Sequence, residues 1–132
     1  MRANQYIPIM EYIRNMESFV KVMKALSDPV RVKMLKMLQE KELCVCELYT
    51  GLGISQSAAS KHLKTLMDAG LVKSEKQGLW MNYSLFYNGP NPFACAILGN
   101  LAMWLEEDKD IKKLKDQLPF LDREKICCKT YK

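Results

Sequence analysis

The chain has 132 residues, of which 48% are hydrophobic and 27% are charged, so it suits one domain with a buried core. Its net charge of +5 is modest and favours an anionic partner without identifying one. No stretch approaches the roughly 18 apolar residues of a membrane span, and residues 1–10 carry no signal-peptide pattern. We therefore expect a cytoplasmic protein without membrane contact. Five cysteines, an odd number, favour reduced or metal-binding thiols over a disulfide framework.

The first third of the chain predicts two helices. Apolar residues recur at helical spacing from residue 9 to residue 26. The sequence of residues 27–29, Ser-Asp-Pro, then supplies an N-cap and a proline at the first helical position. The second helix is expected to reach about residue 38, with its apolar side chains directed inward.

A third and a fourth helix are expected on either side of a glycine. The third starts near residue 43 and ends before Gly53, which can adopt the left-handed conformation that follows many helices. Ser55 caps the fourth helix, and Gly70 ends it. The two helices and the turn between them have the order of a helix-turn-helix.

A β-hairpin and a fifth helix follow. The extended runs 71–75 and 79–85 lie on either side of a turn that contains Gly78, and this pattern predicts a hairpin. Glycines and prolines at 89–92 break the chain before an amphipathic helix. The apolar residues of that helix are Ile97, Leu98, Leu101, Ala102 and Leu105.

These elements predict an α+β, mostly helical fold, a winged helix-turn-helix whose wing is a two-stranded hairpin. On the fourth helix, Ala59, Leu63 and Leu66 form one stripe and polar residues form another. Amide, hydroxyl and ammonium groups are those that meet base edges and phosphates. The candidate DNA-binding residues are Ser55, Gln56, Ser57, Ser60, Lys61, His62 and Lys64 on this helix, and Lys73, Lys76 and Gln77 near the hairpin tip.

Each of these residues also has a simpler interpretation. A polar stripe can be an ordinary solvated helix face, and a charged hairpin tip can serve solubility alone. His62 lies off the centre of the polar stripe, so a packing role or a phosphate contact is preferred for it. The order of helix, turn, capped helix and hairpin favours DNA binding over the simpler interpretation.

Cys44 and Cys46 stand two residues apart just before the predicted recognition helix. Thiolates are soft ligands that select thiophilic ions. In a regular helix, residues two apart point roughly 200° away from each other, so one ion cannot bind both without unwinding that turn. Binding there would distort the element that supports the fourth helix. The alternative is two small buried hydrophobic residues.

Three further cysteines are less informative. Cys127 and Cys128 lie in a polar segment, where they either supply a third thiolate or have no role. Cys95 lies in the apolar fifth helix and is expected in the core.

The motifs resemble those of the ArsR/SmtB family of winged-helix metal-sensing repressors over about residues 26–85. Residues 25–31 resemble the opening of the family's second helix, residues 55–64 its recognition helix, and residues 68–72 the step into its wing. Residues 42–48 are similar to the metal-binding box of the arsenite-responsive branch.

The resemblance implies a repressor, not an enzyme, that binds operator DNA without a cofactor. It implies that As(III) or Sb(III), the inducer, binds Cys44 and Cys46 and that the loaded protein leaves its double-stranded operator. Two positions depart from the family pattern: Tyr49 stands where many arsenic sensors carry a further cysteine, and Leu79 stands where the wing often has arginine.

We expect residues 1–106 to form the DNA-binding and dimerisation domain, and residues 107–132 to form a charged C-terminal tail. The first and fifth helices are expected to form the homodimer interface. The alternatives are a Cd(II)/Pb(II) sensor or a thiol-redox-responsive repressor on the same fold. A thiol oxidoreductase or metallochaperone would instead need a reactive pair on an accessible loop, usually Cys-x-x-Cys, and no DNA-reading helix.

Overall fold

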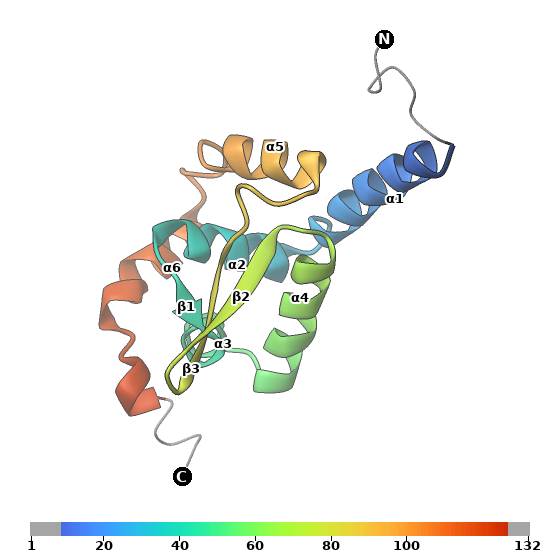
Figure 1. The fold of residues 1–132 in the computed structure, drawn as a ribbon. Helices are drawn as coiled ribbons and strands as arrows, with labels where there is room; N and C mark the ends of the chain where they lie inside the picture. Colours follow the sequence, from blue (N-terminus) through green and yellow to red (C-terminus); the bar gives the residue numbers. More distant parts are fainter. Residues whose placement is uncertain (1–8, 127–132) are drawn as a thin grey trace.

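The computed structural model describes residues 9–126 (Figure 1). Its elements are α1 (Ile9–Ala25), α2 (Pro29–Glu40), β1 (Leu43–Cys44), α3 (Val45–Leu52), α4 (Gln56–Asp68), β2 (Val72–Gln77), β3 (Trp80–Leu85), α5 (Pro92–Leu101) and α6 (Lys109–Gln117). The mostly helical winged helix-turn-helix fold is confirmed. In the part of the chain that the structure describes, no helix is long and apolar enough to cross a membrane.

The sheet has three antiparallel strands in the order β1–β3–β2. The predicted hairpin is present, with Val72 opposite Leu85 at its base and Gln77 opposite Trp80 at its tip. The strand β1 is not predicted from the sequence: its two residues pair with the outer edge of β3, Cys44 opposite Asn82. The third helix therefore begins at Val45 rather than near residue 43.

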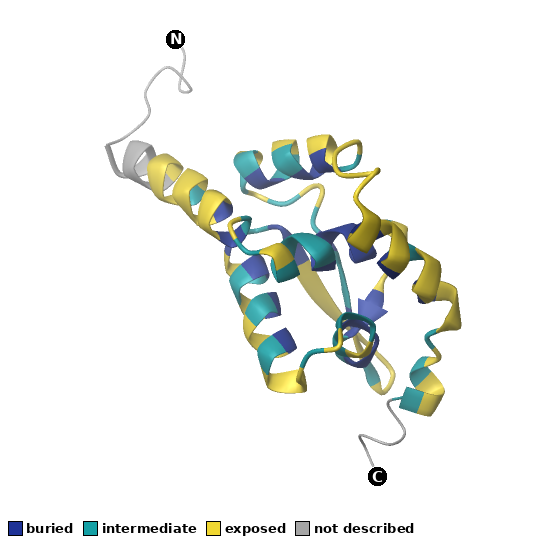
Figure 2. Ribbon diagram, turned by 180° about the vertical axis from the view of Figure 1, so that it is seen from behind, coloured by how far each residue is buried: buried dark blue, intermediate teal, exposed yellow. Residues whose placement is uncertain are grey.

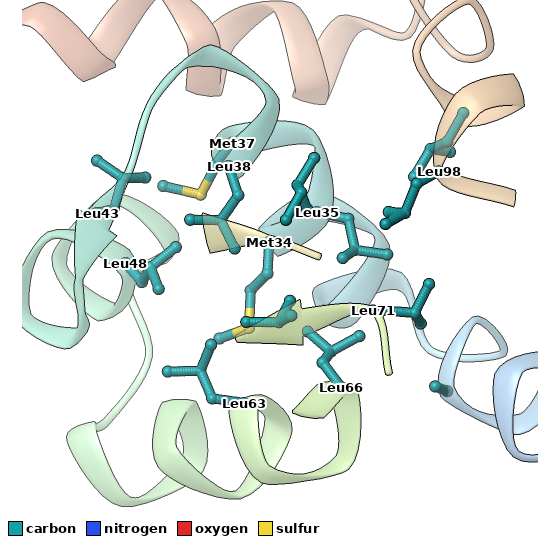
Figure 3. Close-up of a cluster of buried hydrophobic side chains, with 14 of the residues drawn as sticks. Met34, Leu35, Met37, Leu38, Leu43, Leu48, Leu63, Leu66, Leu71 and Leu98 are labelled. Carbon is teal, nitrogen blue, oxygen red and sulfur yellow. The ribbon is translucent and has the colours of Figure 1, made fainter. Parts of the chain in front are cut away.

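Helix α2 lies at the centre of the core. Figure 3 shows its side chains Met34, Leu35 and Leu38 directed into a space enclosed by α3, α4 and α5. The buried residues that meet them from other elements include Leu43, Leu48, Leu63, Leu66, Leu71 and Leu98. Because α3 and α4 both pack on α2, one buried helix fixes the relative position of the two helices of the helix-turn-helix.

Asp28 caps the first turn of α2. Its Oδ1 accepts hydrogen bonds from the backbone N–H groups of Val30 at 2.8 Å and Arg31 at 3.2 Å. Burial raises the pKa of this carboxyl, but the N–H groups of Arg31 and Val30 outweigh burial and hold the pKa below the ordinary value of 3.8. The carboxylate therefore stabilises the folded state at neutral pH.

We predict that Asp28→Ala lowers the free energy of unfolding by about 1 kcal/mol at neutral pH, because the N-cap is lost. The lowered pKa makes this contribution fully present above 3.8 and lost as the pH falls through the folded-state pKa. Urea unfolding of both proteins across this range measures the difference. The exposed Asp116 of α6 provides the control Asp116→Ala. A difference for Asp28→Ala that is undiminished in acid contradicts the prediction.

Part of the segment expected to be a charged tail is folded against the core. Helix α6 packs on α2 and α3, and Ile111, Leu114 and Leu118 are buried. These residues are three and four positions apart, so they share one helix face while the charged residues face outward. Leu118 begins a short 3-10 helix, Leu118–Phe120.

The connection between α5 and α6 is held by a buried lysine of α2. The Nζ atom of Lys36 donates to the carbonyl oxygens of Leu101 at 2.9 Å and Trp104 at 2.7 Å, and it forms an ion pair with Glu106. Lys36 is fully buried, and these partners satisfy its ammonium group. Helix α5 ends at Leu101, earlier than expected, and Leu105 lies outside the helix with a left-handed φ of 63°.

Candidate functional site

The turn between α3 and α4 has the geometry expected of a helix-turn-helix. Gly53 follows α3 with φ of 68° and ψ of 34°, the left-handed conformation that glycine adopts at no steric cost. The Oγ atom of Ser55 then accepts a hydrogen bond from the backbone N–H of Ala58 at 3.1 Å and caps α4. The predicted caps at both sides of this turn are confirmed.

Helix α4 has a buried face and an exposed polar face. Ala59, Leu63 and Leu66 are buried against the core. Figure 2 shows buried and exposed stretches alternating along α4, and Figure 3 shows Leu63 and Leu66 directed towards the core. The exposed residues are Ser55, Gln56, Ser57, Ser60, Lys61 and Lys64. Seen in Figure 1, α4 lies along one side of the molecule, with no other helix over its outer face. The polar groups of this face are therefore accessible to a duplex.

His62 occupies a different position from the polar residues beside it. It is half-buried, and its Nδ1 lies 3.3 Å from Nη1 of Arg31 in α2. The same guanidinium donates through Nε to the carbonyl oxygen of Ala25 at 2.7 Å and through Nη2 to that of Lys24 at 3.0 Å. Arg31, which the sequence analysis did not single out, thus connects α1, α2 and α4.

The candidate residues of the hairpin are all exposed but do not lie together. Lys76 and Gln77 are at the tip. Lys73 is opposite Ser84 near the base, and its Nζ lies 5.5 Å from the centroid of the Phe86 ring, so the expectation that it lies near the tip is wrong. The strand register causes this difference, because β2 continues to Gln77 and lengthens the hairpin beyond the predicted run.

Cys44 and Cys46 lie together at the junction of β1 and α3. Their exposed fractions are 3% and 1%. Cys44 is the N-cap residue of α3 with extended backbone, φ −88° and ψ 168°, and Cys46 lies in the first helical turn. The expectation that both thiols belong to one regular helix is therefore wrong, because Cys44 precedes the helix in an extended conformation. The side chains packed against them are Val45, Tyr49, Trp80 and Ile126.

Glu47 joins this site to the C-terminal part of the chain. Its side chain is only 4% exposed. Its Oε1 accepts hydrogen bonds from the backbone N–H of Cys44 and from Nη2 of Arg123, both at 2.9 Å. The guanidinium of Arg123 also lies 5.6 Å from the centroid of the Trp80 ring. Glu47 at the third helical position is a recognisable N-cap signal, whereas nothing in the local sequence indicates the role of Arg123.

The site is also connected to the wing. Asn82, the strand partner of Cys44, is buried, and its Nδ2 donates to Oε1 of Gln77 at 2.7 Å. Asn82 therefore connects β1 to Gln77 at the hairpin tip. In residues 9–126 no group of three or more His, Cys, Asp or Glu side chains is arranged to hold a metal ion, and the predicted ligands Cys127 and Cys128 lie outside the described residues.

An apolar surface runs along α1 and continues onto α5. Met16, Phe19, Val20 and Met23 are exposed on α1, which extends away from the rest of the molecule (Figure 1). The ring of Phe19 meets that of Phe93 in α5 edge to face, with centroids 5.3 Å apart. An exposed apolar surface of this kind is typical of a protein–protein contact.

Comparison with known proteins places these features in a family. Residues 28–74 match the model of a family described as bacterial regulatory protein, arsR family. The arsenical resistance operon repressor of Escherichia coli (strain K12) is 42% identical over 67 residues, which are 50% of this chain and 57% of that protein. The chain thus spans little more than half the length of that relative.

Two other similarities extend further. The arsenic resistance transcriptional regulator ArsR2 of Pseudomonas putida is 32% identical over 111 residues, 81% of this chain and 95% of that protein. The structure of reduced HlyU from Vibrio cholerae N16961 has 33% sequence identity and a TM-score of 0.56, and the match covers 70% of this chain and 94% of that one. The chain therefore belongs to the arsR family, a family of DNA-binding transcriptional regulators and not of enzymes.

Proposed function

We propose that the protein is a homodimeric repressor that binds double-stranded operator DNA and is released when As(III) or Sb(III) binds Cys44 and Cys46. The observation that carries the proposal is the position of this buried cysteine pair, at the strand–helix junction that begins the helix-turn-helix. The protein acts in the cytoplasm, where thiols stay reduced. DNA binding requires no cofactor.

In the DNA complex, α4 enters the major groove. Gln56, Ser57 and Ser60 reach base edges with amide and hydroxyl groups, and Lys61 and Lys64 reach phosphates. Ser55 holds the first turn of α4 through its cap. Lys76 and Gln77 of the wing tip contact the neighbouring backbone, as does Lys73 from the hairpin base. His62 acts indirectly through its contact with Arg31.

The inducer binds by ligand exchange. Arsenous acid carries three hydroxyl groups on As(III). Each cysteine thiol displaces one of them: an As–S bond forms, an As–O bond breaks, and the thiol proton leaves with the hydroxyl group as water. No oxidation state changes. Two thiols therefore release two waters and leave one As–OH bond. Soft thiolates favour As(III), Sb(III), Cd(II) and Pb(II) over hard cations.

Binding of one ion by both sulfur atoms acts directly on the junction of β1 and α3. Cys44 ends β1 and Cys46 lies in the first turn of α3, so an ion held by both sulfur atoms couples the strand to the helix, and we propose that this coupling shifts the junction. Helix α3 packs on α4, and β1 pairs with β3. The change therefore reaches the recognition helix through α3, and it reaches the wing through Asn82 and Gln77. Both DNA-reading elements are displaced from the positions that fit a duplex.

The proposed dimer gives a prediction about α1. Phe19→Asp introduces a charge into the apolar surface and should convert the dimer to a monomer that binds operator at least tenfold more weakly, because one half-site contact is lost. The dimer's two recognition helices should protect half-sites about 34 Å apart or a multiple of this. Sedimentation and footprinting measure these results. Phe120→Asp is the control, since Phe120 is 84% exposed and lies outside α1 and α5. A dimeric Phe19→Asp protein contradicts the prediction.

The inducer class is tested on the full chain bound to labelled operator DNA. Arsenite, antimonite, Cd(II) and Pb(II) are titrated separately, and fluorescence anisotropy reports release. The proposal expects release by arsenite and antimonite at the lowest concentrations. Release by Cd(II) or Pb(II) at lower concentrations favours the alternative sensor on the same fold. Release by a disulfide-forming oxidant alone favours a redox repressor.

A further inference from the structure

The segment that follows α6 runs from the main core to the cysteine site. Leu118, in the short 3-10 helix, is buried in the core, and Leu121 is half-buried against the same cluster of side chains. The backbone of Leu121 is extended, with φ −84° and ψ 116°, and it separates the 3-10 helix from a helical turn at residues 123–126. The segment is therefore attached to the core before it reaches the thiols.

Arg123 attaches the helical turn to the cysteine site. Its Nη2 donates to Oε1 of Glu47 at 2.9 Å, and its guanidinium lies 5.6 Å from the centroid of the Trp80 ring. The same Oε1 atom accepts a hydrogen bond from the backbone N–H of Cys44. Because the Glu47 side chain is only 4% exposed, its carboxylate depends on hydrogen-bonded partners, and the contact with Arg123 is a strong one.

Ile126, at the end of the turn, is one of the side chains that cover the two thiols. It is half-buried and packs on Cys44 and Cys46, whose exposed fractions are 3% and 1%. A thiol reacts or binds an ion only where that species can reach its sulfur atom. A buried pair therefore becomes reactive when part of its cover opens.

Much of the turn faces solvent. Asp122, Glu124 and Lys125 are exposed, and Asp122 caps the turn by accepting the backbone N–H of Glu124 at 3.0 Å. A segment with little buried surface opens at a lower free energy than the core that it covers. The turn can therefore leave the site while α2, α3 and α4 keep their packing.

We infer that residues 118–126 form a strap over Cys44 and Cys46, and that thiol-binding species reach the pair when the contact between Arg123 and Glu47 opens. Arg123 is then a positioning residue for the cysteine site. The inference rests on the proposed function, because it makes opening of the strap the step that admits the inducer. Arg123 also contacts Trp80 at the hairpin tip, so opening changes the surroundings of the wing as well.

Alkylation of the reduced full chain tests the strap without arsenic. Iodoacetamide reacts with the folded protein, and mass spectrometry follows the tryptic peptide of residues 42–61, which carries both cysteines of the site. Arg123→Gln should raise the alkylation rate of this peptide about tenfold, because it loses a charge-assisted hydrogen bond that keeps the strap closed. Lys125→Gln removes an exposed charge of the same turn and should react as wild type does. Equal rates for the two variants overturn the inference.

Two further readouts separate opening of the strap from a general loss of stability. Cys95, half-buried in α5, is the internal reference, and its alkylation rate should be the same in wild type and Arg123→Gln. Glu47→Gln should also accelerate alkylation of the 42–61 peptide, and combining it with Arg123→Gln should add little, because both changes break the same contact. A parallel rise at Cys95, or a double variant whose rate is the product of the two single effects, overturns the strap.

Arsenite distinguishes failure of the strap from failure of the proposed function. Added before iodoacetamide, it should protect the 42–61 peptide in wild type and in Arg123→Gln, since both proteins keep the two thiols. Absence of protection in both proteins contradicts the proposed function. Protection together with equal alkylation rates for Arg123→Gln and Lys125→Gln contradicts the strap alone.

Discussion

We expect that Cys44→Ser and Cys46→Ser each leave the protein bound to its operator and abolish release by As(III). Serine has nearly the same size as cysteine but lacks the soft sulfur ligand. Neither side chain reaches the exposed face of α4, so operator affinity should stay within about threefold of wild type. The arsenite concentration for half-release should rise by more than about a hundredfold, which corresponds to about 2.7 kcal/mol. Anisotropy titration of operator-bound protein measures both values.

The control for these variants is Cys95→Ser. Cys95 lies in α5, and its Sγ donates to the carbonyl oxygen of Gly89 at 3.4 Å, away from the β1–α3 junction. This variant should respond to arsenite as wild type does. Release of the Cys44→Ser or Cys46→Ser protein at the wild-type concentration places the inducer site elsewhere and contradicts the account.

Replacing both Lys61 and Lys64 by alanine should weaken operator binding tenfold or more at moderate salt. Each lysine that contacts a phosphate displaces a condensed counterion, so its loss flattens the plot of log affinity against log salt by about 0.9. The exposed pair between Lys64 and Asp68, 3.5 Å long, contributes little to stability, so the fold should persist. Operator binding measured over a series of salt concentrations gives both quantities.

Lys112→Ala provides the control for charge alone. Lys112 is exposed on α6, which lies on the opposite side of the molecule from α4 (Figure 1). Its loss removes one positive charge without touching the proposed DNA surface. An equal salt slope for wild type and the Lys61/Lys64 double variant shows that these two lysines do not contact the phosphates.

The recognition element was predictable because its signals are local. Ser55 before a polar-apolar helix and Gly53 in the turn follow capping rules that operate within a few residues. The hairpin around Gly78 is local as well. The strand β1 was not predictable, since two residues form a strand only when β3, far along the chain, offers a free edge.

The cysteine site likewise combines features that the local sequence predicts with features that depend on distant residues. The sequence predicts that Cys44 and Cys46 act as a pair, but a purely helical interpretation places them on opposite helix faces. The structure instead places Cys44 in an extended conformation before α3. Arg123 contacts Glu47, and Ile126 packs on the cysteines, because α6 folds back onto the core and directs the chain that follows it to this site. The apolar residues of α6 are few and stand among many charged ones, so the sequence does not indicate this packing. A contact between residues so far apart in the sequence leaves no pattern in the residues around either partner.

The central claim is that occupation of the cysteine site and binding of the operator oppose each other. The most direct measurement is the affinity for arsenite with and without saturating operator DNA, followed by tryptophan fluorescence because Trp80 packs against the cysteines. Thermodynamic linkage requires that DNA weaken arsenite binding by the same factor by which arsenite weakens DNA binding. We predict equal factors of tenfold or more. An arsenite affinity that is unchanged by saturating operator contradicts it.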